Sequence, residues 1–190
     1  MTSDRWTTRI EEISNAFRKE FGGLSAKQLN WKPDTQTWSI AQNIQHLIVL
    51  NETYYPVINQ VRNKTYKLPF IAKLGFMVQF LGKIILKAVH PNRRKKVKTF
   101  SIWEPSATEI DATILEQFGK HQEELKKFIT ESMDLVEAGT IISSPANRSI
   151  VYKLETAFDV IVTHEQRHFE QANELPTTQI SGYKEDSNKN

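Results

Sequence analysis

The chain has 190 residues, which is enough for one domain with a substantial core and leaves little room for a second. Its 39% hydrophobic and 25% charged residues are ordinary for a globular protein. The net charge of +3 is small and comes largely from the run at 93–98, so the composition does not indicate a nucleic-acid-binding face. Cysteine is absent, which excludes disulfides, cysteine-ligated zinc, iron–sulfur clusters and a cysteine nucleophile.

The first residues, MTSDRWTTRIEE, are polar and include acids, unlike a signal peptide. Together with the absence of cysteine, this pattern leads us to expect a cytoplasmic protein. We expect a single helical domain over residues 1–176 and a polar, flexible tail over residues 177–190.

The apolar spacing predicts an amphipathic helix over residues 4–21, ended by Gly22 and Gly23. A second helix is expected to begin at Ile40, because Ser39 and Gln42 form the pattern of a capping box. Pro56 lies inside this second helix and removes one backbone donor. A kink is therefore predicted about one turn before it.

Two further helices are predicted towards the C-terminus. Ser106 and Glu109 form another capping-box pattern, which predicts a helix over residues 106–133. The last helix is predicted from about residue 149 to 174, before Pro176. No β-pattern stands out, so the sequence predicts an all-α fold, a four-helix bundle.

The stretch at 68–91, LPFIAKLGFMVQFLGKIILKAVHP, is long and apolar but contains Lys73, Lys83 and Lys87. Three lysines argue against a membrane-spanning helix. One interpretation is an interfacial helix whose neighbouring RRKKVK run contacts anionic lipid, so that residues 68–98 form a lipid-binding surface. The interpretation we favour is a helix that packs across the bundle or against a partner subunit, without a membrane.

Residues 164–168 read HEQRH, a match to the H-E-x-x-H pattern of zinc peptidases. A metzincin would continue with glycine and histidine at positions that are Gln171 and Glu174 here. Other zincins take a carboxylate from a later helix, for which the remaining residues leave no room. The peptidase interpretation is therefore rejected.

The two histidines of this motif still indicate a site. His164 and His168 are four residues apart, so they lie on one face of the helix, the face that points into the bundle. Burying two imidazoles without partners is costly, and a metal ion, an acid or water would provide one. Periodicity leaves both His46 and His121 as a third ligand, whereas His90 is expected to be exposed.

Three segments resemble the DinB/YfiT-like superfamily, in the same order and spacing: LNWKPDTQTWSIAQNIQHL, VKTFSIWEPS and HEQRHFEQ. The resemblance covers most of residues 5–175. It implies a four-helix bundle with an extra helical insertion between the second and third helices. It also implies a divalent metal ion, zinc or nickel, on three histidines, which by position are His46, His164 and His168. The chain departs from the family at SSPANRSIVYK, where a glycine-containing loop is usual.

The resemblance further implies a metal-dependent hydrolase, or a transferase that moves a low-molecular-weight thiol onto a small-molecule substrate. Three neutral imidazoles leave an open coordination position, as in catalytic metal sites. Glu165 would serve as a general base, or alternatively pair with a nearby cation or hold a ligand histidine. His121 would be a proton shuttle or a hydrogen-bonded core residue. The loop tryptophans would wall a pocket or cover the core: Trp31, Trp38 and Trp103.

Two other interpretations stay open at this point. The chain is alternatively a non-catalytic bundle whose metal site is structural or vestigial, or a lipid-surface-binding protein that acts through residues 68–98. A homodimer is expected in either case, because the apolar 68–90 segment needs a partner surface.

Overall fold

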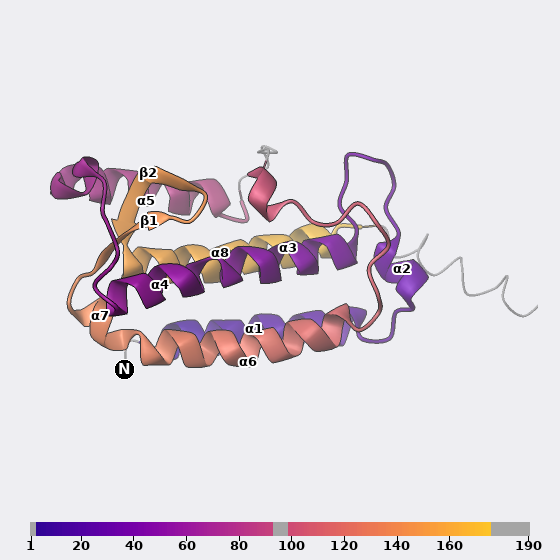
Figure 1. The fold of residues 1–190 in the computed structure, drawn as a ribbon. Coiled ribbons are helices and arrows are strands. Elements are labelled where there is room, and N and C mark those ends of the chain that lie inside the picture. The colour runs from indigo at the N-terminus through magenta and orange to yellow at the C-terminus, as the bar shows by residue number, and fades with distance from the viewer. Residues whose placement is uncertain (1–2, 93–98, 176–190) are drawn as a thin grey trace, which may run out of the picture.

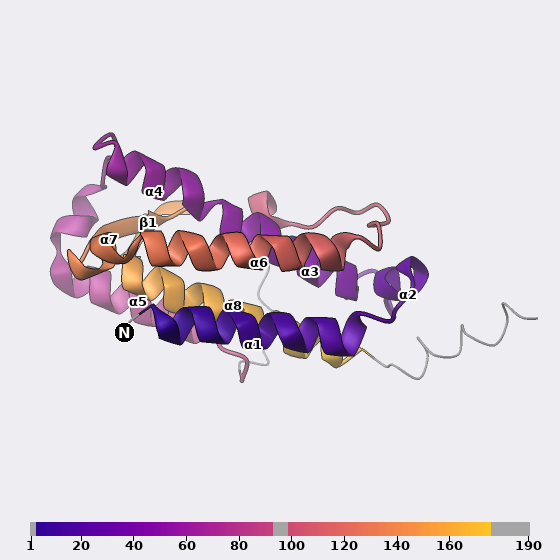
Figure 2. The ribbon, with the colours of Figure 1, turned by 90° about the horizontal axis from the view of Figure 1, so that it is seen from below.

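The computed structural model describes residues 3–92 and 99–175. Its main body is a helical bundle (Figure 1), in which α1 packs against α6 and α8, and α3 packs against the same two helices. Figure 2 shows α1 and α6 from below, with α3 and α8 behind them. The bundle helices are α1 (Asp4–Phe21), α3 (Ile40–Glu52), α6 (Ile114–Glu131) and α8 (Leu154–Asn173).

The first two predicted helices begin where the sequence indicates. Helix α1 spans the predicted residues and buries its apolar stripe. Helix α3 begins at Ile40, and the Ser39 hydroxyl accepts from the Gln42 backbone N–H at 3.1 Å while the Gln42 side chain accepts from the Ser39 N–H. The helix is interrupted at Thr53 and continues as α4 (Tyr54–Arg62), which confirms the kink predicted before Pro56.

The predicted start of the third helix is wrong, because α6 begins at Ile114 rather than at residue 106. The Ser106 backbone is held by α3 instead: its N–H donates to Gln45 Oε1 at 2.6 Å and its carbonyl accepts from Gln42 Nε2 at 2.9 Å. Its hydroxyl accepts from the Thr108 N–H in a local turn. The segment before α6 is thus tied along α3, and α7 (Met133–Glu137) follows α6.

The last predicted helix is also too long at its start. Residues Asn147–Lys153 form strand β2, which pairs antiparallel with β1 (Ile141–Ser144). Ile150, Val151 and Tyr152 are β-branched or aromatic residues that suit a half-buried strand. The described residues therefore form the mostly helical fold that was predicted, with a small two-stranded sheet that the all-α prediction did not include.

The stretch between α4 and α6 forms an insertion on one side of the bundle. It contains the short helix η1 (Phe70–Lys73), helix α5 (Gly75–Val89) and η2 (Ser101–Trp103), and α5 lies against β2 and α8 (Figure 1). The approach is close, since a Cβ atom on Gly82 would lie 3.2 Å from Thr156 Cγ2. This confirms the helix that we expected to pack across the bundle.

Some predictions fall on residues that are not described. The basic run at 93–98 and the tail from 177 lie outside the described ranges. Within those ranges, every helix is too short or too polar to cross a membrane.

Among the described residues, two large apolar clusters form the core at the two ends of the bundle, and a smaller third cluster joins α5 to the hairpin. One large cluster, near the hairpin, includes Trp6 and Phe158; the other, near the short helix α2 (Ala26–Asn30), includes Phe17 and Phe118. Buried polar side chains lie between the two large clusters along the helices: Asn51, His121, Gln122 and Glu165. This interior polar layer lies beside the candidate site and bears on its interpretation.

Candidate metal centre

Three histidines from two neighbouring helices meet at one point. His46 comes from α3, and His164 and His168 come from α8, which packs along α3. One ring nitrogen from each lies within 4.8 Å of the others. Helix periodicity left His46 and His121 open as the third member, the family resemblance selected His46, and the structure brings His46 to this position. A group of three such imidazoles could hold a metal ion.

Hydrogen bonds at the Nδ1 atoms orient two of these rings. His46 Nδ1 lies 2.6 Å from the Trp103 carbonyl oxygen, which can only accept, so Nδ1 carries the proton. Asn43 donates through Nδ2 to the Ser39 carbonyl at 2.8 Å, so its Oδ1, 2.7 Å from His168 Nδ1, accepts from that ring. Both rings therefore keep the lone pair on Nε2, the tautomer that such a partner imposes on a metal-ligating histidine.

The spacing of the free nitrogens suits a common metal ion. His164 Nε2 and His168 Nε2 lie 3.0 Å apart. Two imidazole nitrogens that bind one tetrahedral zinc ion at about 2.0–2.1 Å are separated by roughly 3.3 Å. The two rings need only a small adjustment to share an ion.

Burial keeps all three imidazoles neutral, which is the form that binds metal. It lowers the pKa of His46 to about 4, although the hydrogen bond to the Trp103 carbonyl acts in the opposite direction. Burial, reinforced by neighbouring charged groups, holds the pKa values of His164 and His168 well below the ordinary value. The group therefore offers nitrogen lone pairs at neutral pH without first losing protons.

An open cavity of about 1470 Å³ lies over the three histidines. Trp38 stacks on His168, with ring centroids 5.8 Å apart, and the Trp103 indole donates to the Thr53 hydroxyl at 3.3 Å. Both tryptophans line the cavity, as one of the two interpretations predicted, whereas Trp31 packs against the apolar cluster near α2. A small molecule can therefore reach the histidines beside aromatic walls.

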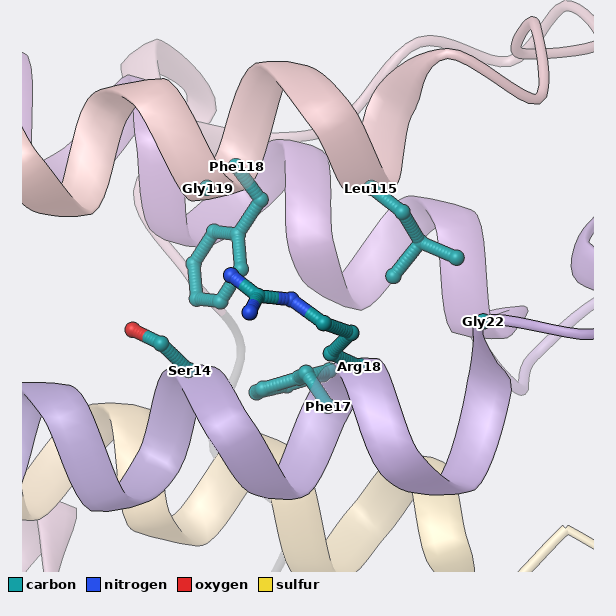
Figure 3. A pocket seen from close by; sticks show the side chains of 7 residues that line it. All are labelled: Ser14, Phe17, Arg18, Gly22, Leu115, Phe118 and Gly119. Carbon is teal, nitrogen blue, oxygen red and sulfur yellow. The ribbon is translucent and has the colours of Figure 1, made fainter.

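A second hollow, between α1 and α6, is much smaller (Figure 3). It measures about 40 Å³ and is lined by Phe17, Arg18 and Phe118 among others, with no histidine. This volume is little more than a few water-sized spheres, so it is unsuited to a substrate.

Glu165 and His121 lie in the interior polar layer instead. Glu165 is fully buried, does not line the cavity, and accepts from Asn51 Nδ2 at 2.8 Å. Asn51 Nδ2 also lies 3.3 Å from His121 Nε2. Burial raises the pKa of Glu165 to about 7, against the opposing effect of the amides of Gln122 and Asn51. The general-base role of Glu165 stays a prediction.

The sequence reasoning missed the residues that orient the rings. Asn43 lies three residues before His46 in the same capped helix, and Trp103 acts through its backbone carbonyl. The buried asparagine was the available signal, since a polar side chain on the apolar face of α3 needs a partner. A carbonyl partner leaves no trace in the sequence.

Comparison with known proteins agrees with this geometry. The sequence profile of the DinB superfamily matches residues 9–172, a range that contains the three histidines, all of α3 and all of α8 except its last residue. The chain belongs to the DinB superfamily. No match was found among curated proteins or among solved structures. The resemblance seen in the three sequence segments is thus confirmed for this DinB-superfamily chain, while the binding of a metal ion stays a prediction.

Proposed function

We propose that this DinB-superfamily protein is a metal-dependent enzyme, a hydrolase or a transferase of a low-molecular-weight thiol. His46, His164 and His168 would hold one divalent ion, zinc or nickel, within a four-helix bundle formed by α1, α3, α6 and α8. The observation that carries the proposal is the convergence of three neutral imidazoles at the floor of an open cavity. A site with three protein ligands and access from solvent is typical of catalytic rather than structural zinc.

When bound, such an ion acts as a Lewis acid that lowers the pKa of a water or thiol ligand and polarises a substrate carbonyl. The chain's own residues would orient the ligand histidines and enclose the substrate. The Trp103 carbonyl and Asn43 hold two of the imidazoles, and Trp38 covers one side of the ring of His168. The aromatic walls would exclude water from one side of a substrate.

Glu165 fits this scheme better as a buried structural group than as a base. Its carboxyl group is bonded to Asn51 and is closed off from the cavity. A general base must come within hydrogen-bonding reach of the proton that it removes. We therefore assign no proton-transfer step to it, and its replacement tests that assignment.

The decisive experiment is the metal content of the protein, measured by mass spectrometry on untagged material. Wild type should carry about one ion per chain, His168→Ala should carry none, and His121→Ala should keep it, because His121 lies outside the triad. Wild type without metal after reconstitution with zinc and with nickel would contradict the proposal. So would an ion retained by His168→Ala.

The reaction class is tested next with metal-loaded protein. Turnover of model esters would favour the hydrolase, and consumption of a low-molecular-weight thiol with an electrophilic acceptor would favour the transferase. Either activity should disappear in His168→Ala. Bound metal without turnover on either panel, together with a lower melting temperature after chelation, would instead favour a structural site.

A further inference from the structure

The charges of the chain are unevenly distributed along the sequence. Between Glu52 and Glu104 the chain contains no aspartate or glutamate, yet it contains eleven of the 25 lysines and arginines. The acid-free stretch, residues 53–103, includes η1, α5 and η2. Arg62 pairs with Asp134 of α7. The lysines of α5 are exposed, and no carboxylate of their own stretch is available to neutralise them.

The same stretch holds the exposed apolar side chains. Among the described residues, every large hydrophobic side chain classed as exposed lies between Leu68 and Ile102. On α5, Phe76 is 69% exposed, Phe80 56% and Ile84 45%. Apolar side chains are normally scattered singly over a protein surface, so a concentration of this kind indicates an interaction surface.

Helix α5 divides cleanly into two faces. Val78 and Gly82 are buried against the hairpin and α8. At 100° per residue, the exposed phenylalanines share the opposite face with Lys83 and Lys87. The adjoining η1 adds the Phe70 ring, which is 73% exposed and has Lys73 Nζ at 5.6 Å from its centroid. The outward face therefore combines aromatic rings with amino groups.

We propose that this outward surface docks on anionic lipid bilayers. We define the α5 face by six residues: Phe70, Phe76, Phe80, Lys83, Ile84 and Lys87. Its rings would enter the boundary between headgroups and acyl chains, as in helices that lie in the plane of a membrane. Its lysines would contact the negative headgroups, and each such contact strengthens binding to an anionic leaflet.

The charges favour a lipid surface over a second copy of the chain. In a symmetric dimer through the α5 face, Lys83 and Lys87 would meet lysines of the other copy, and residues 53–103 contain no acid to separate them. An anionic bilayer neutralises these amino groups and also accepts the exposed rings. Nucleic acid would supply phosphates too, but the aliphatic Leu74 and Ile84 gain nothing from stacking on bases.

Docking would place the cavity next to the lipid. Ile85, Ala88 and Val89 of α5 line the cavity above the histidines, and so does Phe100. The inference does not depend on the metal or on any reaction, because it uses only the outer surface of the insertion.

The test is co-sedimentation of the full chain with vesicles. Phosphatidylcholine vesicles are compared with vesicles that also contain phosphatidylserine. Wild type should bind the anionic vesicles and not the neutral ones. Lys83→Gln/Lys87→Gln should weaken binding roughly twentyfold, from about fivefold per lysine. Phe76→Ser/Phe80→Ser should weaken it about tenfold or more at unchanged charge.

A matched control removes the same charge elsewhere. Lys120→Gln/Lys127→Gln alters two exposed lysines of α6 that pair with Glu116 and Glu131. This variant should bind within about twofold of wild type, since these lysines lie outside the α5 face. Circular dichroism confirms that each variant is folded before its binding is compared.

Five results would overturn the inference. One is wild type that does not sediment with anionic vesicles, and another is equal weakening by the α6 control. A third is binding that survives the loss of both phenylalanines. The fourth is a solution dimer that the phenylalanine variant alone converts to monomers, which would assign the α5 face to a second copy. The fifth is tighter binding to an oligonucleotide than to vesicles, which would assign the face to nucleic acid.

Discussion

Two buried polar groups lie side by side in this protein, and each is built around an asparagine of α3. Asn43 serves the cavity cluster, which consists of Asn43 and the three histidines. Asn51 serves the interior polar layer, with His121, Gln122 and Glu165. The residue types are similar, but the hydrogen bonds run in different directions.

In the cavity cluster, hydrogen bonds hold two of the histidine rings at their Nδ1 atoms. The Trp103 carbonyl and Asn43 each occupy an Nδ1, so that two Nε2 lone pairs are left towards a common point beneath open space. In the interior layer the side chains bond to one another, and Asn51 contacts both His121 and Glu165. Among the described residues, Asn51 Oδ1, His121 Nδ1 and Glu165 Oε2 still have no partner, so the interior layer is only partly satisfied. It nevertheless lies away from the cavity, whereas the cavity cluster presents its free Nε2 atoms to a ligand.

The largest effect is expected from breaking the interior layer. Asn51→Ala removes the donor to a fully buried carboxyl group and leaves Glu165 and His121 without this partner. The free energy of unfolding should fall by about 3 kcal/mol. Urea unfolding measures this as a lower midpoint at unchanged slope. The number of bound metal ions should stay as in wild type, and a loss of metal would contradict the separation of the two groups.

The pH dependence of the unfolding free energy should reveal the titration of His121. Burial lowers the pKa of His121 to about 4, from an ordinary value of 6.5, so the folded chain leaves it neutral where the unfolded chain binds a proton. The unfolded state then holds more protons, and stability is lost as the pH falls from the unfolded towards the folded pKa. For His121 alone the loss should be roughly 2 kcal/mol between about pH 7.5 and pH 5.

Metal-free wild type and His121→Asn isolate this contribution, since the other buried titrating groups are common to both. Their difference in unfolding free energy should change with pH in this range and level off above it. Glu165 acts in the opposite sense, because its raised pKa of about 7 favours the folded state as the pH falls below that value. A pH-independent difference between the two proteins would show that His121 titrates normally.

The smallest effect is expected from a substitution in the cavity cluster, Asn43→Ala. The substitution leaves His46, His164 and His168 in place but frees the His168 ring to turn. Metal affinity should fall about 10–100-fold, the usual cost of losing a group that orients a ligand. Isothermal titration with zinc measures it, with Asn51→Ala as the matched control that retains affinity. Equal losses in both variants would mean that the effect comes from the fold and not from ring orientation.

Several of these features were predictable because they depend on local rules. The capping box at Ser39 and Gln42 set the start of α3, and Pro56 indicated the break at Thr53. Spacing four residues apart placed His164 and His168 on one face of α8. The same kind of rule failed at Ser106, because side chains of α3, distant in sequence, satisfied its backbone first.

The sequence by itself therefore determined the apolar faces of α1 and α3 and the pairing of two imidazoles on α8. Tertiary structure decided that residues 147–153 are a strand. The apolar run at 150–152 suits a helix or a strand, and the pairing with β1 selects the strand. It also decided between His46 and His121 where helix periodicity could not, and it agrees with the family resemblance, which had selected His46. Periodicity says which way a side chain points from its own helix, but only the packing of α3 against both α8 and α6 determines that His46 meets His164 and His168 while His121 meets Asn51.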